Sequence, residues 1–505
     1  MTKFIDAAVD RTTMYRLVLY YLGSLLAAAF VLGFFRLIPA DPTALAFSTV
    51  LIVAVCWVSN LAFAQVFKTP ANAESAYITA LIIALIMNPV VATDMPGVGG
   101  LICASVWAIA SKFILAIGRK HLFNPAAIGV ALTALLLGQP ATWWVGGAPI
   151  LLPLVLAGGL LIGRKLQRFD LIAAFLIANL AVVAATAGPG GIVSSLGEAL
   201  LHSPIFFLAF AMLTEPATAP QARWPRLAFG VLVGVLAAPS IHFGGVYLTP
   251  ELALLVGNAF AFLVSPKGKY ALTLTRIEHT ANATYDFVFR PDRKLKFRSG
   301  QYLEWTLGVK HPDNRGNRRS FTVASAPTED EVRLGVKFYP EASAFKRSLA
   351  AMQPGDKIYA AQPAGNFVLP RDSRAKLAFI AGGIGITPFR SMLQHLLDRG
   401  ERREVVLLYG NAMIADIAYT DVIERAQREL GVKTVYAVAA EPVRAAGMHQ
   451  GFIDAELIRR EVPDFRERTF YVSGPHAMVV LFKQVLREMG VASFRIKTDF
   501  FPGLA

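Results

Sequence analysis

The sequence predicts a polytopic α-helical membrane domain that is followed by a β-barrel and a doubly wound α/β domain. Of its 505 residues, 55% are hydrophobic and the mean hydropathy is +0.49, which is typical of a protein with several membrane spans. Residues 1–264 hold only 13 of the 49 Lys and Arg and 9 of the 35 Asp and Glu. Beyond this point, strand patterns replace the long apolar runs. The predicted domains are residues 1–266, 267–370 and 371–505.

Ten apolar segments in the first domain are candidate membrane spans. Basic residues fall in alternate loops, so the positive-inside rule places both termini and the soluble domains in the cytoplasm, which requires an even number of spans. The N-terminal residues MTKFIDAAVDRTTMYR contain acids and no cleavage site, so we expect an integral protein of the cell inner membrane without a removable signal peptide. The segments are about 17–35, 45–63, 76–93, 98–117, 125–138, 149–163, 170–187, 204–213, 227–243 and 247–264.

Two proline motifs recur in the two halves of the membrane domain. Asn-Pro at residues 88–89 corresponds to Glu-Pro at 215–216, and Asn-Pro at 124–125 corresponds to Thr-Pro at 249–250. Copies of five spans point in opposite directions, so we expect an inverted repeat whose broken helices surround a ligand or cavity. Alternatively, the prolines only end helices at the membrane–water interface, and the Lys112 side chain extends along apolar surface to place its ammonium group in water. The candidate membrane-site residues are Lys112, Asn124, Thr214, Glu215 and Thr218.

Charge and cysteine content narrow the functional classes. The net charge is +14, and the region after residue 264 carries +10 of it, from 36 Lys and Arg against 26 Asp and Glu. No nucleic-acid motif accompanies this excess, so we expect attraction to anionic lipid or to an anionic cofactor, and no nucleic-acid partner. The two cysteines, Cys56 and Cys103, exclude a disulfide scaffold and a four-cysteine metal site within this chain. We predict no metal site.

The region from residue 267 to residue 370 reads as a small antiparallel barrel. Alternating segments such as ALTLTRIEHT, TYDFVFRP and QYLEWTLGV predict its strands. The segment NRRSFTVASAP places Arg319, Ser320, Phe321 and Thr322 on one strand, where a guanidinium, hydroxyls and an aromatic ring could grip the pyrophosphate of a flavin and cover its ring system. The alternative is a barrel strand with a solvated arginine.

A glycine turn organises the last domain. An apolar strand pattern at 376–381 runs directly into Gly382, Gly383 and Gly385, and Pro388 opens a helical pattern. Glycine lets the backbone approach a pyrophosphate, which the N–H groups of the following helix attract. Strands and helices alternate from Arg371 onward, so the ligand crevice is expected at the carboxyl ends of the strands. An ordinary structural βα turn is the alternative.

Three membrane signatures resemble a known family. ESAYITALIIALIMNP at 74–89, RKHLFNPAAIG at 119–129 and MLTEPATAP at 212–220 are similar to those of the membrane-protein family shared by the Rnf electron-transport complex and the sodium-pumping NADH:quinone reductase. The resemblance covers about residues 15–264 and implies ten spans. Relatives hold FMN covalently on a threonine in an outer loop. The corresponding loop, 138–149, lacks that motif, so we do not assign covalent attachment to Thr142 and expect noncovalent FMN or riboflavin.

The region from Lys269 to Ala505 resembles the ferredoxin–NADP reductase superfamily, whose motifs occur here in the family's order. The resemblance implies FAD on the barrel and NAD(P)H on the α/β domain. Ala412 stands where many relatives carry arginine, so the choice between NADH and NADPH stays open. It assigns flavin contacts to Arg319, Phe321 and Thr322; adenine-side and phosphate contacts to Gly335, Lys337 and Ser343; nucleotide contacts to Gly382, Gly383, Gly385, Pro388, Gly474 and Pro475; and catalytic positions to Thr387, Ser473, Asp499 and Phe500.

Together the two regions predict an NAD(P)H-dependent FAD oxidoreductase that feeds electrons into its membrane domain. The first hypothesis is a transmembrane conduit to a membrane flavin or an outer-face redox partner. The second is an NAD(P)H:quinone reductase. The third is an inverted-repeat transporter or channel that the reductase regulates or drives. The bilayer and NAD(P)H are partners in all three.

Overall fold

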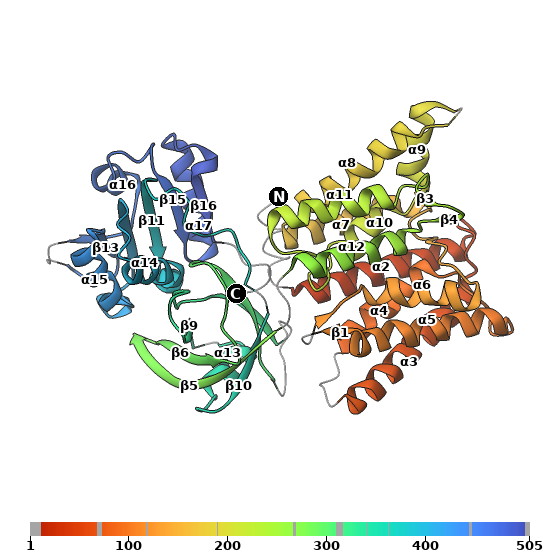
Figure 1. The fold of residues 1–505 in the computed structure, drawn as a ribbon, viewed down its shortest axis with the longest axis horizontal. Helices are drawn as coiled ribbons and strands as arrows, with labels where there is room; N and C mark the ends of the chain where they lie inside the picture. Colours follow the sequence, from red (N-terminus) through yellow and green to blue (C-terminus); the bar gives the residue numbers. More distant parts are fainter. Residues whose placement is uncertain are drawn as a thin grey trace. The chain divides into compact units, whose positions relative to one another are not determined.

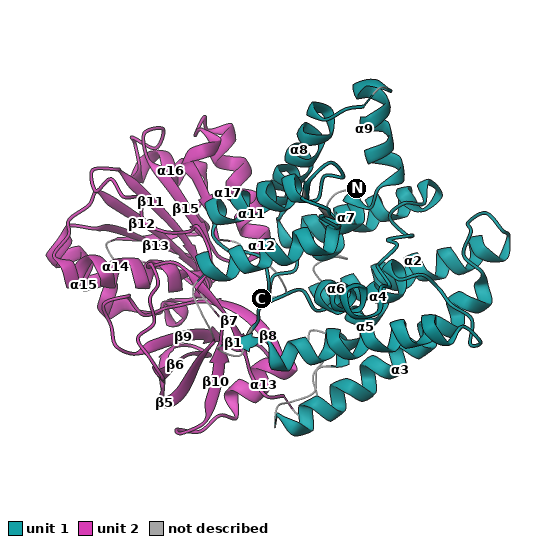
Figure 2. Ribbon diagram, turned by 45° about the vertical axis from the view of Figure 1, so that its right-hand side comes forward, with its two compact units in different colours: residues 1–268 teal, residues 269–505 magenta. Residues whose placement is uncertain are grey.

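The computed structural model describes residues 12–67, 73–117, 120–188, 190–265, 269–309, 317–340, 342–361, 363–443 and 447–499. The chain divides into two compact units, Met1–Gly268 and Lys269–Ala505, which Figure 2 colours separately. The predicted boundary at 266/267 falls outside the described residues. The boundary at 370/371 stays a prediction, because the second unit is not divided further.

The first unit is built of helices (Figure 1). Within the described residues, four helices are long and apolar enough to cross a membrane, and a pair bent by 57° would make a fifth. Several others are apolar but shorter, so the count of ten spans stays a prediction. The helices are α2 (Met14–Phe34), α3 (Pro42–Val66), α4 (Ala73–Ile86), α5 (Met95–Ile114), α6 (Pro125–Leu137), α7 (Leu152–Leu166, after η1 at Pro149–Leu151), α8 (Phe169–Ala185), α9 (Gly191–His202), α10 (Ile205–Phe207) with η2 (Leu208–Met212), α11 (Arg223–Leu236) and α12 (Pro250–Val264).

Polar caps and prolines start the helices at the positions that the sequence suggests. The Asp41 carboxylate accepts a hydrogen bond of 2.6 Å from the Thr43 N–H at the start of α3. The Asn124 side chain accepts one of 3.1 Å from the Ala127 N–H at the start of α6. A proline follows each cap, where its missing N–H removes no helical hydrogen bond.

One succession of elements occurs twice in this unit. A short hairpin, β1 (Ala116–Ile117) with β2 (Lys120–His121), follows α5 and precedes α6. A second hairpin, β3 (His242–Phe243) with β4 (Val246–Tyr247), follows α11 and precedes α12. Both helices after the hairpins start with proline, at Pro125 and Pro250.

Helix α9 is absent from the predicted apolar segments. Its sequence, GIVSSLGEALLH, contains two serines, two glycines and a glutamate, so it lacks the sustained apolar run by which the other helices were identified. It forms the bent pair with α10 and η2, and Ala199 packs with Val183 and Ala238.

The second unit contains an antiparallel sheet with the strand order β8-β7-β10-β5-β6-β9. Trp305, Phe287 and Phe289 are fully buried against it. Closure of this sheet into a barrel stays a prediction. The elements are β5 (Tyr270–Ala281), β6 (Thr284–Pro291), β7 (Tyr302–Thr306), β8 (Arg318–Thr322), β9 (Val332–Lys337), α13 (Ala344–Ala350) and β10 (Lys357–Ala360).

The remainder forms a parallel sheet with the order β14-β13-β12-β11-β15-β16. Two separate apolar cores show that helices cover both faces, with α14 and α15 on one face and α16 and α17 on the other. The elements are β11 (Leu377–Gly382), η3 (Gly383–Ile386), α14 (Thr387–Arg399), β12 (Val405–Asn411), η4 (Ile414–Asp416), α15 (Thr420–Leu430), β13 (Lys433–Val438), β14 (Met448–Gln450), α16 (Ala455–Glu461), β15 (Thr469–Ser473), α17 (His476–Glu488), η5 (Ser493–Arg495) and β16 (Ile496–Thr498).

Candidate functional site

The glycine turn between β11 and α14 packs closely against the end of β15 and the start of α17. A Cβ on Gly382 would lie 2.2 Å from the Met478 sulfur, and one on Gly385 would lie 2.4 Å from the Ser473 carbonyl oxygen. Gly383 has a φ of +52°, and a Cβ there would meet nothing within 4 Å. Gly382 and Gly385 therefore allow close packing, whereas Gly383 leaves an open surface at the start of α14.

Three predicted site residues meet at the carboxyl end of β15. The Ser473 hydroxyl donates a hydrogen bond of 3.1 Å to Asp499 Oδ2, and the Thr322 hydroxyl donates one of 3.5 Å to the same oxygen. The Asp499 N–H in turn donates to the Val472 carbonyl at 3.0 Å. The strand of the antiparallel sheet, the parallel sheet and the C-terminal segment thus converge on one carboxylate. Phe500 lies outside the described residues.

The predicted flavin-binding strand is β8. Arg319 is only 3% exposed, its Nη1 donates to the Arg318 carbonyl at 2.6 Å, and its guanidinium lies 5.5 Å from the Phe345 ring centroid. Phe321 also packs against Phe345, with the ring centroids 5.9 Å apart. Ser320 is buried beside them. The arrangement holds a cation and an aromatic ring on the strand that ends at Thr322.

The predicted adenine-side residues have local roles in the structure. Lys337 Nζ lies 2.8 Å from Asp416 Oδ1, which is an ion pair. Ser343 caps α13 by accepting a hydrogen bond of 3.2 Å from the Lys346 N–H. A Cβ on Gly335 would lie 2.3 Å from the Tyr419 hydroxyl and 2.8 Å from Thr387 Cγ2. Gly335 therefore permits close contact between the antiparallel sheet and the glycine turn, whose Pro388 is buried in the first turn of α14.

The residues that join the two sheets were not predicted from the sequence. The Tyr419 hydroxyl donates a hydrogen bond of 2.5 Å to Asp286 Oδ1, and both side chains are buried. Burial raises the pKa of Asp286 above its ordinary value, although the bond from Tyr419 and the Arg333 guanidinium favour the carboxylate. The second link is the Arg390 guanidinium, which donates to Glu329 Oε1 at 3.0 Å and to the Ala324 carbonyl at 3.1 Å. Local patterns gave no signal for either link, because each partner lies far away along the chain.

The raised pKa of Asp286 gives a pH-dependent stability. Between the ordinary pKa of 3.8 and the raised pKa, the folded protein holds a proton that the unfolded chain has released, so the free energy of unfolding falls as pH rises. Asp286→Asn removes this titration and is expected to flatten the fall in thermal unfolding midpoint as pH rises from the ordinary pKa of 3.8 through the raised one. Asp421→Asn, on the exposed start of α15, is the control and should leave the slope unchanged. An equal slope in wild type and Asp286→Asn would contradict the assignment.

In the first unit, Glu215 collects hydrogen bonds from three segments. Its Oε2 accepts bonds of 2.8 Å from Asn124 Nδ2 and 3.0 Å from the Thr218 hydroxyl. Its Oε1 lies 3.2 Å from His121 Nε2. Asn124 also donates its N–H to Asn258 Oδ1 at 2.8 Å. Three predicted residues therefore form one cluster, and His121 and Asn258 join it although they were not predicted.

Thr214 lines a small cavity at this cluster, and Lys112 contacts Ser75, which lines the same cavity. Lys112 Nζ donates to the carbonyl and hydroxyl oxygens of Ser75 at 2.9 and 3.0 Å. The Thr214 hydroxyl donates to the Phe210 carbonyl at 2.7 Å. The cavity has a volume of about 60 Å³, and its polar lining is Ser75, Thr79, Asn124, Thr214 and Glu215.

The loop at 138–149 caps the buried end of α4. The N–H groups of Thr142 and Trp143 both donate to the Ile86 carbonyl at 2.9 Å, and the Thr142 hydroxyl donates to it at 3.3 Å. The Trp144 indole donates to the Ala84 and Met87 carbonyls at 3.2 and 3.0 Å. The free carbonyls of a helix that ends inside the unit are thereby satisfied. Thr142 has a structural role here.

Comparison with known proteins gives matches in both regions. Residues 379–484 match the model of the oxidoreductase NAD-binding domain, and residues 135–267 match that of the NQR2, RnfD, RnfE family. Both predicted resemblances are confirmed by these matches.

Curated relatives are similar over part of their length. The flavohemoprotein of Bacillus subtilis is 28% identical over 236 residues, which are 45% of this chain and 58% of that protein. The NADPH oxidoreductase of Mycobacterium tuberculosis is 31% identical over 210 residues, which are 41% of this chain and 52% of that protein. A solved cytochrome P450 reductase from Amycolatopsis is 25% identical with a TM-score of 0.42, and the match covers 46% of this chain and 69% of that one.

The chain therefore spans little more than half the length of the two curated relatives. A region that matches the NQR2, RnfD, RnfE family is followed along the chain by a region that matches the oxidoreductase NAD-binding domain.

Proposed function

We propose that this chain is a membrane-bound NAD(P)H-dependent FAD oxidoreductase that delivers electrons from cytoplasmic NAD(P)H through FAD into its membrane unit. The observation that carries the proposal is that the Thr322 and Ser473 hydroxyls both donate to Asp499 Oδ2. It brings the strand with the flavin motif next to the end of β15, beside the glycine turn that a nucleotide would use.

The residues of the second unit fit both ligands. Gly383 has left-handed backbone and open space at the start of a 13-residue helix, so a diphosphate can approach the N–H groups there. Buried Arg319 supplies a cation on the strand where a flavin pyrophosphate would lie, and Phe321 supplies an aromatic face. The full set of proposed contacts is that given above for the ferredoxin–NADP reductase resemblance.

The chain's own contribution is orientation. A bound flavin supplies the conversion of a two-electron hydride transfer into single-electron steps. Ser473 holds the Asp499 carboxylate in place, and Thr387 starts α14 with its hydroxyl donating to the Ile384 carbonyl at 3.2 Å. These contacts fix the end of β15 and the start of α14, between which we place the nicotinamide and flavin rings. No side chain of the site has to act as a general acid or base, because hydride transfer moves no proton to the protein.

For the membrane unit we propose ten spans arranged as an inverted repeat with both ends cytoplasmic. The repeated succession of helix, hairpin and proline-initiated helix supports this arrangement. The proposed FMN or riboflavin does not fit the cavity at Glu215. That cavity has a volume of about 60 Å³, whereas a cavity of about 150 Å³ accommodates benzene alone. We therefore assign no step to a flavin at Glu215.

The purified full-length chain provides the test. We expect about one FAD per chain that acid precipitation releases, because the proposed contacts are noncovalent. Anaerobic addition of NADH or NADPH should bleach its absorbance near 450 nm, roughly the usual wavelength of oxidised flavin. A chain without flavin, or a flavin that neither nucleotide reduces, would overturn the proposal.

Sealed proteoliposomes distinguish the acceptors. Reduction of an impermeant carrier inside the vesicle by NAD(P)H outside supports a transmembrane route to an outer-face partner. Oxidation of NAD(P)H that requires a quinone in the bilayer supports a quinone reductase. Solute flux that proceeds without NAD(P)H would identify a transporter.

A further inference from the structure

The connection between β6 and β7 carries a dense row of bases. Arg290, Arg293, Lys294, Lys296 and Arg298 are all exposed, and we call them the basic strip. Between them, Leu295 is 6% exposed and packs into the core of the antiparallel sheet, with Phe297 packed against the same core. The apolar side chains therefore anchor the segment while the bases face solvent.

Four of the five bases of the strip lack a carboxylate partner in the described parts of the chain. Among the residues that the structure describes, Arg290, Lys294, Lys296 and Arg298 form no ion pair. Several other bases of this unit are paired with carboxylates. The paired bases include Arg276, Arg333, Lys337, Lys376, Arg390, Arg403, Arg425, Arg428, Lys433, Arg460 and Arg468.

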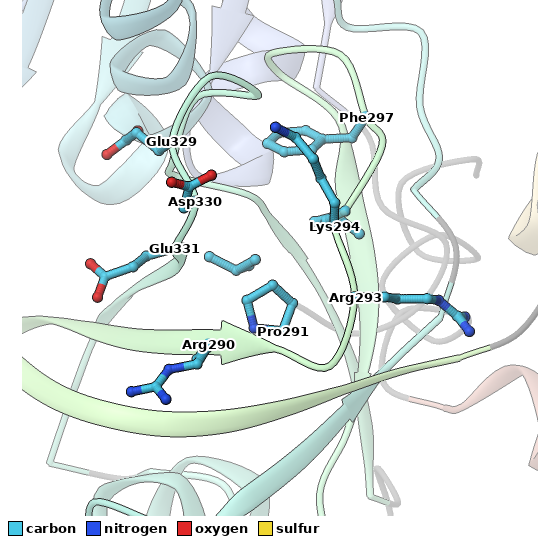
Figure 3. Close-up of a pocket in the computed structure, with 10 residues that line it drawn as sticks. Arg290, Pro291, Arg293, Lys294, Phe297, Glu329, Asp330 and Glu331 are labelled. Carbon is cyan, nitrogen blue, oxygen red and sulfur yellow. The ribbon is translucent and has the colours of Figure 1, made fainter.

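A cavity of about 210 Å³ lies beside the strip, and its other wall is acidic (Figure 3). Two of the three carboxylates in that wall are engaged elsewhere, because Glu331 pairs with Arg276 and Glu329 with Arg390. Figure 3 shows Arg293 extending away from all three carboxylates. With Asp330 in the wall and Asp292 within the segment, the five bases still leave a net positive charge here.

The strip is tied to the residues that follow the last helix of the first unit. Arg293 Nη2 donates a hydrogen bond of 3.2 Å to the Lys269 carbonyl, and its guanidinium lies 4.7 Å from the Tyr270 ring centroid. Lys269 comes five residues after Val264, at which α12 ends. A chain of five residues reaches at most about 18 Å. The chain length therefore keeps Lys269 within about 18 Å of the end of α12.

We propose that the basic strip docks on the anionic lipid headgroups of the membrane in which α12 ends. This inference rests on the proposed function, because it takes α12 as a membrane span. An anionic leaflet attracts bases that lie within about one Debye length, roughly 8 Å at physiological salt. The short connection limits the distance between Lys269 and the end of α12, and docking itself would bring the strip within that range. The exposed bases Arg290, Lys294, Lys296 and Arg298 supply the charge. Docking would fix which face of the second unit turns toward the bilayer.

Hydrogen exchange of the full-length chain in lipid nanodiscs tests this docking. We compare discs of phosphatidylcholine with discs that contain about 30% phosphatidylglycerol, and follow the amides of residues 291–301. Anionic discs are expected to slow their exchange about 10-fold. The triple variant Arg290→Gln, Lys294→Gln, Lys296→Gln should lose this protection, and so should the wild type at about 0.5 M salt.

The matched control is the triple variant Arg459→Gln, Lys483→Gln, Arg487→Gln, which removes three exposed bases from α16 and α17. It should keep the lipid-dependent protection. Equal exchange rates in the two kinds of disc would overturn the inference. Soluble polyglutamate added to phosphatidylcholine discs tests whether any polyanion protects these amides, and equal protection there would overturn the assignment to lipid headgroups. NAD(P)H-driven dye reduction in the same samples separates the two proposals. It stays at wild-type level in the strip variant when only docking is lost, and it is absent from the wild type when the proposed function fails.

Discussion

Purified Arg319→Ala protein is expected to be nearly colourless, because it loses most of its FAD. Arg319 is buried on β8, where its guanidinium is positioned by the Arg318 carbonyl and the Phe345 ring. A charge-assisted hydrogen bond contributes about 1.5–3 kcal/mol, so its removal weakens binding about 10- to 100-fold. The measurement is the ratio of flavin absorbance to protein absorbance after gel filtration, followed by titration with added FAD.

Arg318→Ala is the matched control for this change. Arg318 is on the same strand as Arg319, and its Nη1 lies 3.5 Å from Glu304 Oε1. Loss of that partly exposed ion pair costs at most about 1 kcal/mol, and flavin content should stay at the wild-type level. Full flavin retention in Arg319→Ala would show that the cofactor is bound elsewhere. A folded, colourless Arg318→Ala protein would contradict the assignment to Arg319.

Gly385→Ala is expected to retain FAD and to lower NAD(P)H turnover about 100-fold. The new Cβ would lie 2.4 Å from the Ser473 carbonyl oxygen and 2.6 Å from Gly474 Cα and N, which are backbone atoms. The ends of β11 and β15 must therefore separate, and the hydrogen bond from Ser473 to Asp499 moves with them. Misplacement by about 1 Å is sufficient for a rate loss of this size. The measurement is single-turnover reduction of the bound flavin by NADH and NADPH.

Gly410→Ala provides the control at the same edge of the sheet. Gly410 on β12 pairs with Gly382 on β11. A Cβ added to Gly410 would lie 3.4 Å from its nearest atom, Ile453 Cδ1, which is an ordinary contact. Its turnover should lie within about 3-fold of wild type. Wild-type reduction rates in Gly385→Ala would mean that the end of β15 does not position the reacting groups.

Local patterns predicted most of the elements. TYDFVFRP coincides with β6, and the apolar strand pattern at 376–381 coincides with β11 to within one residue. Strands buried on both faces give unbroken apolar runs, which is why they were easy to find. Helix α9 was missed because its polar and glycine residues interrupt the apolar pattern, although tertiary packing still makes it helical.

The site was predicted in outline and completed by contacts between distant residues. Gly382, Gly383 and Gly385 could be found because a glycine turn between a strand and a helix is a local pattern. The membrane cluster was found only in part. Glu215, Asn124 and Thr218 stood out as polar groups in or beside apolar runs, whereas His121 lies 94 residues from Glu215 and follows a basic loop.

The sequence by itself determined the apolar segments, the strand alternation, the glycine turn and the uneven charge, because each depends on neighbours along the chain. The tertiary structure decided which of these features meet. Thr322 and Asp499 are 177 residues apart and converge only when the two sheets of the second unit pack together. The same packing buries Asp286 under Tyr419. No periodicity encodes such pairs, because the free energy that selects them comes from burying whole sheets and helices against one another.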